Sequence, residues 1–358
     1  MGDFLNRQFE PGLYASMKRK GYDLVPYVNF SGETPDNGWP EFFDSPRYSS
    51  GFAALWNCFG FITETHMLKS FDKRVRATYA LMESFIEFAG RHGNIIQSIR
   101  RQTKKEMQTI TAFPIRWQVD SSKYTGITFK GYEAAKKNSA VSGLPRLFYD
   151  RDKPYEKKIK FYNTYLPTLT IQKPLAYIVP QGWWKVIDLL ALNKVTMRRL
   201  KKDTTIEVTT YHITDYTSTA VQYEMHHPNS NVAISSTAEK YNFRKGDYII
   251  SMNQSASRFI MEVLEPQSND SYFAWNYFDA ILGQKERYSN YVFEDRAADF
   301  LQKNPDIRLK LEHRKESDSV FATSAKAQLD FVFKNSPYFE PDFYRYPVFR
   351  VERTNVVQ

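Results

Sequence analysis

The sequence predicts an α/β region over residues 1–112, followed by a β-rich, sandwich-like α+β domain over residues 113–358. The chain has 358 residues, which is more than one hydrophobic core usually organises. Apolar residues recur mainly at helical spacing before residue 113. Beyond it, short β-like runs alternate with turn signals at fairly even spacing. Hydrophobic residues make up 42% and charged residues 25%, a balance typical of folded globular proteins.

The first region is expected to mix short helices with two strands. A helix over residues 11–21 has a proline near its start and a glycine at its end. Residues 24–30 (LVPYVNF) read as a strand, and residues 49–59 as a small helix. Residues 61–64 (FITE) then predict a short buried strand.

Two longer helices are expected to close this region. Residues 70–91 carry apolar side chains at helical spacing, which predicts an amphipathic helix. His92 and Gly93 are expected to end it, and a second helix is expected over residues 95–109. The helix that follows Glu64 therefore begins six residues after it.

The second region is expected to be dominated by strands. Its β-like runs cover residues 115–119, 126–132, 158–165, 176–179, 205–211, 231–235 and 247–252. Helical patterns interrupt them at residues 183–192, 294–302 and 325–334. Many short strands with regular turn signals favour a sandwich-like arrangement.

Composition limits the classes of function. The formal charge is +9, but basic residues are scattered among acids and no nucleic-acid motif accompanies them, so no nucleic-acid partner is expected. The single cysteine, Cys58, excludes an internal disulfide, and its apolar neighbours indicate a buried, unreactive thiol. No apolar run is long enough to span a membrane, and the first residues lack the pattern of a signal peptide.

Glu64 is the strongest candidate for chemistry. It ends an apolar segment just before a loop and a long helix, and such positions often hold catalytic groups. A partly desolvated carboxylate there could act as a general base. The alternative is a carboxylate that forms a structural ion pair near the start of the helix.

Residues 46–88 (PRYSSGFAALWNCFGFITETHMLKSFDKRVRATYALMESFIEF) resemble the end of a bacterial zinc carboxypeptidase domain of the carboxypeptidase A type. Residues 22–51 resemble the same proteins, as do residues 176–184, 264–286 and 346–350. The resemblance implies the final part of an α/β/α domain with its accessory domain. It also implies peptide hydrolysis, a periplasmic or secreted location, and zinc in the complete enzyme.

The resemblance assigns roles to four residues. Glu64 matches the general base on the final strand of the family fold. Arg47 and Tyr48 are candidates for substrate-binding residues. His66 stands where family members hold a substrate-contacting arginine, so it either contacts a substrate carboxylate or caps the following helix.

The zinc ligands of the family are missing from this sequence. The family uses a His-x-x-Glu pair and a later histidine, all before the general base, whereas no histidine precedes Glu64. The single His-x-x-Glu, from His313 to Glu316, lies in a highly charged stretch that suits a solvated surface. The adjacent His226 and His227 would point to opposite sides of an extended chain. No metal ligand or cofactor is therefore assigned within this chain.

The sequence thus favours the C-terminal part of a metallocarboxypeptidase, either encoded separately or cut from a longer chain. It is expected to be inactive alone, and its partners would be a peptide substrate or the missing N-terminal half of the peptidase domain. A non-catalytic peptide- or glycan-binding module is the alternative, with aromatic clusters at Trp183-Trp184 and residues 272–277. Core packing explains those clusters equally well.

Overall fold

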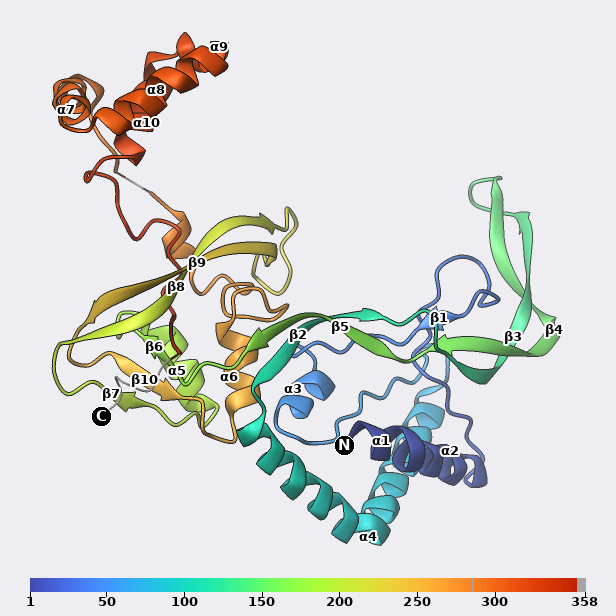
Figure 1. Cartoon of the computed structure of the whole chain (residues 1–358). Coiled ribbons are helices and arrows are strands. Elements are labelled where there is room, and N and C mark those ends of the chain that lie inside the picture. Colours follow the sequence, from blue (N-terminus) through green and yellow to red (C-terminus); the bar gives the residue numbers. More distant parts are fainter. Residues whose placement is uncertain (285, 353–358) are drawn as a thin grey trace.

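The computed structural model describes residues 1–284 and 286–352, and it begins with three consecutive helical segments (Figure 1). These are α1 (Gly2–Phe4), the π-helical η1 (Leu5–Phe9) and α2 (Glu10–Arg19). Helix α2 confirms the helix expected over residues 11–21. Gly21 follows it with a φ of 85°, the left-handed conformation that glycine adopts without strain. After a long loop come the two-residue strand β1 (Trp39–Pro40) and helix α3 (Ser49–Leu55).

Helix α4 (Phe71–Thr109) spans both of the long helices that the sequence predicts. The expected break at His92 and Gly93 is therefore wrong, although Figure 1 shows the helix bending between its two halves. The His92 ring stacks on Phe88 at 4.1 Å and lies 3.0 Å from the carbonyl of Phe88 through Nδ1. Glycine inside a helix costs only about 1 kcal/mol, so the helix continues through Gly90 and Gly93.

The strands expected over residues 24–30 and 61–64 are absent from the described structure. Neither segment belongs to a helix or pairs in a sheet. The apolar side chains pack on helices instead. Phe61 lies 5.2 Å from Phe9 and 4.9 Å from Phe85, measured between ring centroids. Leu24 packs against the same helical layer.

Two long antiparallel pairs follow α4. Strand β2 (Ala112–Val119) pairs with β5 (Tyr165–Gln172), and β3 (Thr125–Asn138) pairs with β4 (Pro145–Tyr162). Strand β1 adds to β4 in parallel, with Trp39 opposite Phe161. The pairing of β3 with β4 shifts after Tyr132, where β4 has extra residues and the hairpin changes direction (Figure 1).

A six-stranded antiparallel sheet forms the centre of the second region. Its order is β7-β10-β6-β11-β8-β9. The strands are β6 (Ala176–Val179), β7 (Arg198–Arg199), β8 (Thr204–Ser218), β9 (Asn229–Phe243), β10 (Tyr248–Ser251) and β11 (Phe349–Val351). Helices α5 (Trp184–Leu192) and α6 (Ser257–Leu264) pack on one face, where a sandwich would place a second sheet.

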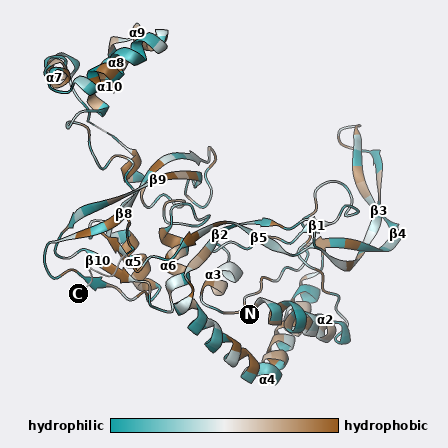
Figure 2. Ribbon diagram, viewed as in Figure 1, coloured by the Kyte–Doolittle hydropathy of each residue, from teal (hydrophilic) through white to brown (hydrophobic). Residues whose placement is uncertain are grey.

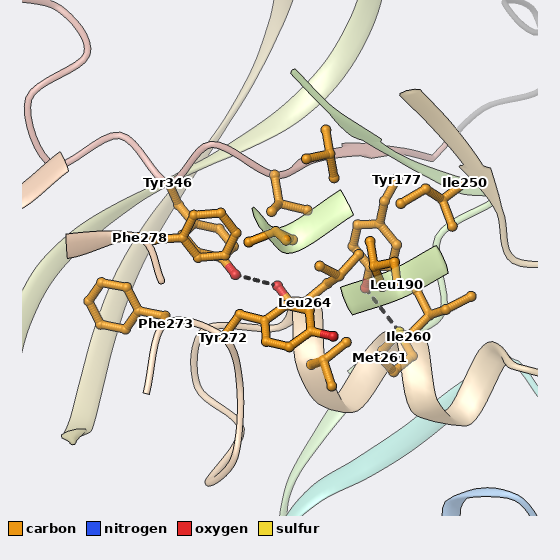
Figure 3. Packing of buried hydrophobic residues seen from close by; sticks show 14 of the residues in the cluster. Tyr177, Leu190, Ile250, Ile260, Met261, Leu264, Tyr272, Phe273, Phe278 and Tyr346 are labelled. Carbon is orange, nitrogen blue, oxygen red and sulfur yellow. Dashed lines mark hydrogen bonds between the residues drawn. The ribbon is translucent and has the colours of Figure 1, made fainter. Parts of the chain in front are cut away.

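The largest hydrophobic core lies between this sheet and the two helices. Figure 3 shows Tyr177 and Ile250 from the sheet packed with Leu190 of α5 and Leu264 of α6. The hydroxyl of Tyr346 donates to the carbonyl of Leu264 at 2.8 Å. Hydrophobic residues are concentrated on β10, α5 and α6 in Figure 2. Alternate residues of the strands, including Ile178 and Ile249, form a separate cluster.

The remaining helices form a small lobe with its own core. After the 3₁₀ helix η2 (Asp279–Leu282) come α7 (Asn290–Lys303), α8 (Pro305–Ser317), α9 (Ser319–Ala322) and α10 (Ala325–Lys334). Phe293, Leu311 and Phe333 are buried among them. The described chain thus combines helices with mixed and antiparallel sheets, and its general α/β character agrees with the sequence.

Contacts cross the expected domain boundary between residues 112 and 113. Strand β1 pairs with β4, and Leu55 belongs to the same core as Phe113. The side chain of Arg47 binds Asp270 at 2.7 Å. The division at residue 112 stays a prediction, since each part keeps clusters of its own.

Candidate functional site

A cavity of about 660 Å³ lies between the N-terminal helices and the extended segments that follow them. It is called the carboxylate cavity here because Glu10, Glu41, Asp44 and Glu64 line it. Among the described residues, no lysine, arginine or histidine side chain contributes to its wall. Aromatic and aliphatic side chains supply the rest of the lining: Tyr14, Tyr27, Phe42, Phe61 and Ile62.

Glu41 is the most perturbed carboxylate in this cavity. Burial, followed by the nearby carboxylates of Glu10 and Asp44, raises the pKa of Glu41 to about 7. Burial also raises the pKa of Glu10, and burial with the charges of Glu10 and Glu41 raises the pKa of Tyr14 to about 12. A carboxylate that titrates near neutral pH can exchange protons efficiently under physiological conditions. The sequence analysis missed Glu41, although its position between Pro40 and Phe42 in an aromatic segment suggested burial.

Glu64 lies in the wall of the same cavity, on the extended segment that leads to α4. Its side chain is exposed. Among the described residues, Glu64 has no hydrogen-bond or ion-pair partner, so the structural ion pair considered for it does not form. A free carboxylate on a cavity wall is accessible to water and to a ligand. Its role as general base stays a prediction.

Arg47 and Tyr48 lie together in the wall of a second cavity, of about 700 Å³. The two cavities share Phe42 and Phe43. Arg47 donates from Nε to Asp270 Oδ1 at 2.7 Å and from its backbone N–H to Asp270 Oδ2 at 2.9 Å. Its guanidinium lies 5.0 Å from the ring centroid of Trp275. Asp270 therefore already neutralises the charge of Arg47.

Tyr48 has a raised pKa, because burial disfavours its charged form and it interacts with the hydroxyl of Tyr223. Tyr223 lines the same second cavity. The structure thus brings Arg47 and Tyr48 together, but it places Glu64 in the neighbouring cavity. A ligand that contacts all three residues would have to reach past Phe42 and Phe43. Substrate binding by Arg47 and Tyr48 stays a prediction.

His66 is exposed and accepts a hydrogen bond at Nδ1 from the backbone N–H of Leu68 at 3.2 Å. It lines neither the carboxylate cavity nor the second cavity. This hydrogen bond closes a turn before α4, and Leu68 lies outside the helix, which begins at Phe71, so the bond does not cap the helix. Substrate contact by His66 stays a prediction.

Zinc does not fit the side chains of the described residues. Within residues 1–284 and 286–352, no group of three or more His, Cys, Asp or Glu residues could hold a metal ion. His226 packs edge-on against Trp275 at 5.3 Å. The His227 ring lies 2.9 Å from the carbonyl of Thr219, and His313 is exposed on α8. No catalytic step through zinc is derived from this chain.

The aromatic clusters considered for ligand binding belong mostly to the hydrophobic core. Tyr272 and Phe273 are buried. Trp183 packs edge-on against Phe278 at 5.0 Å. Trp184 is exposed, with the ammonium of Lys185 lying 5.6 Å from its ring centroid. Core packing therefore accounts for most of these side chains.

The chain was compared with known protein families, curated proteins and solved structures, and none of them matches it. Among the described residues, no helix is both long and apolar enough to cross a membrane. Helix α4 has the length, but charged residues occur throughout it. Functional inference therefore depends on the residues and cavities described above.

We expect the Glu41→Gln variant to remove part of the pH dependence of stability. The folded pKa of Glu41 is about 7, above the ordinary value of 4.5 for a glutamate, because burial favours its protonated form. Stability from this group is present below pH 4.5 and is lost as pH rises through 7. As the pH rises from 4 to 8, the free energy of unfolding of the variant should increase by about 3 kcal/mol relative to that of the wild type. Urea unfolding at several pH values measures this, and parallel pH profiles for the two proteins would contradict it.

Proposed function

We propose that this chain is the C-terminal part of a zinc-dependent metallocarboxypeptidase, with Glu64 as the general base of peptide hydrolysis. The sequence resemblance motivates the proposal, and an uncovered face of α4 supports it. This α4 face consists of Phe71, Val75, Tyr79, Met82 and Ile86, which follow one another at helical spacing and are 48–74% exposed. The neighbouring Met67 and Leu68 are exposed as well.

The opposite side of α4 is covered by α2. Ala80, Leu81 and Ser84 are buried against α2, and Ser16 donates a hydrogen bond to Ser84 at 2.9 Å. Helix α4 is therefore apolar on two sides, and the described residues cover one of them. Large continuous apolar surfaces are uncommon on isolated soluble proteins. A closing helix of an α/β/α domain would bury such a face against the rest of that domain.

The free energy that would be gained by burying the exposed α4 face favours a partner that covers it. Burying one large apolar side chain contributes about 1.5–3 kcal/mol, so covering the α4 face would be strongly favourable. The segments at residues 24–30 and 61–64, which lack sheet partners here, would be available for pairing. Their pairing with the remainder of a peptidase domain would restore the strands that the resemblance implies.

Within this proposal, the residues of this chain supply the general base and the groups that orient the peptide. The Glu64 carboxylate would accept a proton from the attacking water, and Arg47 and Tyr48 would orient the peptide. The zinc ligands would come from the missing part of the domain. The complete enzyme would act in the periplasm or outside the cell, as the resemblance implies.

We expect the present chain to bind no zinc stoichiometrically, because its described residues contain no suitable ligand group. The same chain, extended by the reading frame upstream of Met1, should bind one zinc per molecule and release C-terminal residues from peptides. Metal analysis after dialysis and a peptide-release assay measure these results. An upstream sequence without a His-x-x-Glu segment and a later histidine would contradict the proposal. Tight one-to-one zinc in the present chain would also contradict it.

A further inference from the structure

The closing loop of the β3–β4 hairpin carries exposed aliphatic side chains. Figure 1 shows this hairpin extending away from the rest of the chain, with its closing loop farthest out. Residues 136–146 form what is called the hairpin tip here. At its centre, Val141 is 98% exposed and Leu144 is 67% exposed. Two aliphatic side chains therefore stand in solvent at the end of a projecting arm.

Several backbone N–H groups of the hairpin tip are paired within its loop. The N–H of Ser139 donates to the carbonyl of Leu144 at 2.8 Å, and the N–H of Gly143 donates to the carbonyl of Ser139 at 3.0 Å. The hydroxyl of Ser139 accepts from the N–H groups of Val141 and Ser142 at 3.1 and 3.2 Å. Paired donors lower the cost of moving this loop into a less polar layer.

Positive charge surrounds these apolar side chains. Lys136 and Lys137 precede the loop and Arg146 follows it, whereas residues 134–149 contain no acidic residue. All three side chains are exposed. Lys136 pairs with Glu33 at 3.1 Å, but both partners are well exposed, and such pairs are weak and exchange readily.

We propose that the hairpin tip binds the surface of an anionic lipid bilayer. Val141 and Leu144 enter the boundary between headgroups and acyl chains, and Lys136, Lys137 and Arg146 contact the anionic headgroups. Apolar insertion combined with basic residues is the pair of forces that holds peripheral proteins on membranes. The loop presents the two apolar side chains with the backbone N–H groups of Val141 and Leu144 already paired.

Other binding partners fit the hairpin tip less well than a bilayer does. A nucleic acid would be held through its phosphates and by stacking on aromatic side chains, and it would gain nothing from Val141 and Leu144. A second copy of the chain would need about 1,000 Å² of total buried surface or more for a specific interface. Two aliphatic side chains on a narrow projecting loop supply little of that area. A bilayer accommodates a narrow insertion without a complementary shape.

The test is binding of the intact chain to vesicles of phosphatidylcholine, with and without phosphatidylserine, at low and at physiological salt. The wild type should bind only the phosphatidylserine vesicles. The Val141→Ser/Leu144→Ser variant should bind at least about tenfold more weakly, because it loses its apolar insertion. The Lys136→Gln/Lys137→Gln/Arg146→Gln variant should bind about a hundredfold more weakly, because each cation near the surface contributes about fivefold.

Matched controls change similar residues elsewhere on the surface. Val221→Ser/Met225→Ser removes two apolar side chains that are 80% and 85% exposed on the turn between β8 and β9. Lys201→Gln/Lys202→Gln/Lys240→Gln removes three exposed charges near the six-stranded sheet. Both controls should bind vesicles as the wild type does, and thermal unfolding should show every variant to be folded.

Three outcomes would overturn the proposal. The first is an absence of wild-type binding to phosphatidylserine vesicles at low salt. The second is an equal loss of binding in the control variants. The third is a loss in the charge variant without any loss in the Val141→Ser/Leu144→Ser variant, which would make the hairpin a general polyanion-binding surface. Binding of single-stranded DNA with the same affinity as vesicles would support that last interpretation.

Discussion

Replacing Glu265 with alanine is expected to destabilise the protein by about 3–5 kcal/mol, the usual consequence of leaving a buried charge without its partner. Glu265 follows α6 and forms a salt bridge with Arg350 of β11. The two side chains are 1% and 4% exposed. The hydroxyl of Tyr177 also donates to the Glu265 carboxylate, so the group connects a helix end with two strands.

The opposing influences on Glu265 explain the size of this effect. Burial raises the pKa of Glu265, while the guanidinium of Arg350 lowers it. Burial is the largest single influence on the pKa of Arg350 and lowers it, but the carboxylate of Glu265 together with Tyr177, Tyr211 and Glu352 raises it more, so the net shift is upward. Each charge is therefore tolerated because the other is present. Without Glu265, Arg350 would remain in the sheet with its main compensation removed.

Glu352 provides a matched control on the same arginine. Arg350 donates from Nε to Glu352 at 2.8 Å, but the Glu352 side chain is 39% exposed. Partly exposed pairs contribute about 0–1 kcal/mol, so Glu352→Ala should change stability little. Urea unfolding measures both variants. Equal losses, or a loss below about 1 kcal/mol for Glu265→Ala, would show that the buried pair does not hold the sheet to α6.

The sequence predicts those helices and strands whose local apolar pattern agrees with the contacts that they make in the folded chain. The strand at residues 176–179 and the helix at residues 325–334 have the expected limits. Helix α6 and helix α8 were missed for different reasons. Helix α6 is short and includes Glu262, which pairs with Arg258 inside the protein. Helix α8 is so highly charged that its sequence indicates a solvated stretch, although Leu311 is buried in the core of its lobe.

The two wrong strands show a limit of hydrophobic patterns. An extended apolar run such as residues 61–64 must be covered, but its sequence does not say whether a strand or a helix covers it. Here Phe61 packs between aromatic rings of the N-terminal helices and α4. Phe61 is half-buried, whereas Ile62, Thr63 and Glu64 are exposed, so the segment lacks the alternation of a half-buried strand.

The arrangement of the candidate site is harder to predict from the sequence than the strands are, because it depends on contacts between residues far apart in the chain. Glu64, Arg47 and Tyr48 were identified from local sequence, but the pairing of Arg47 with Asp270 joins residues 223 positions apart. Glu41 was missed because its pKa depends first on burial and then on Glu10, which reaches the cavity from α2. Burial and charge coupling of this kind exist only after the chain has folded.

Glu64→Gln is expected to reduce turnover of the complete enzyme by about 10²–10⁴-fold, because a positioned general base contributes roughly that factor. This prediction depends on the proposed function. Glutamine keeps the size and hydrogen-bonding atoms of the side chain but cannot accept a proton from water. Zinc content and folding should therefore remain unchanged, and the loss should appear in kcat more than in KM.

Glu41 lines the same cavity and is the rival base, because its pKa lies near neutral pH. The Glu64 assignment requires that Glu64→Gln lowers kcat far more than Glu41→Gln does. Glu156→Gln, on the exposed surface of β4 and outside both cavities, controls for general effects of removing a carboxylate. A larger loss for Glu41→Gln would transfer the role to Glu41, since its carboxylate would then be the group that accepts the proton of the attacking water. Equal, small losses for both variants would show that neither carboxylate is the base.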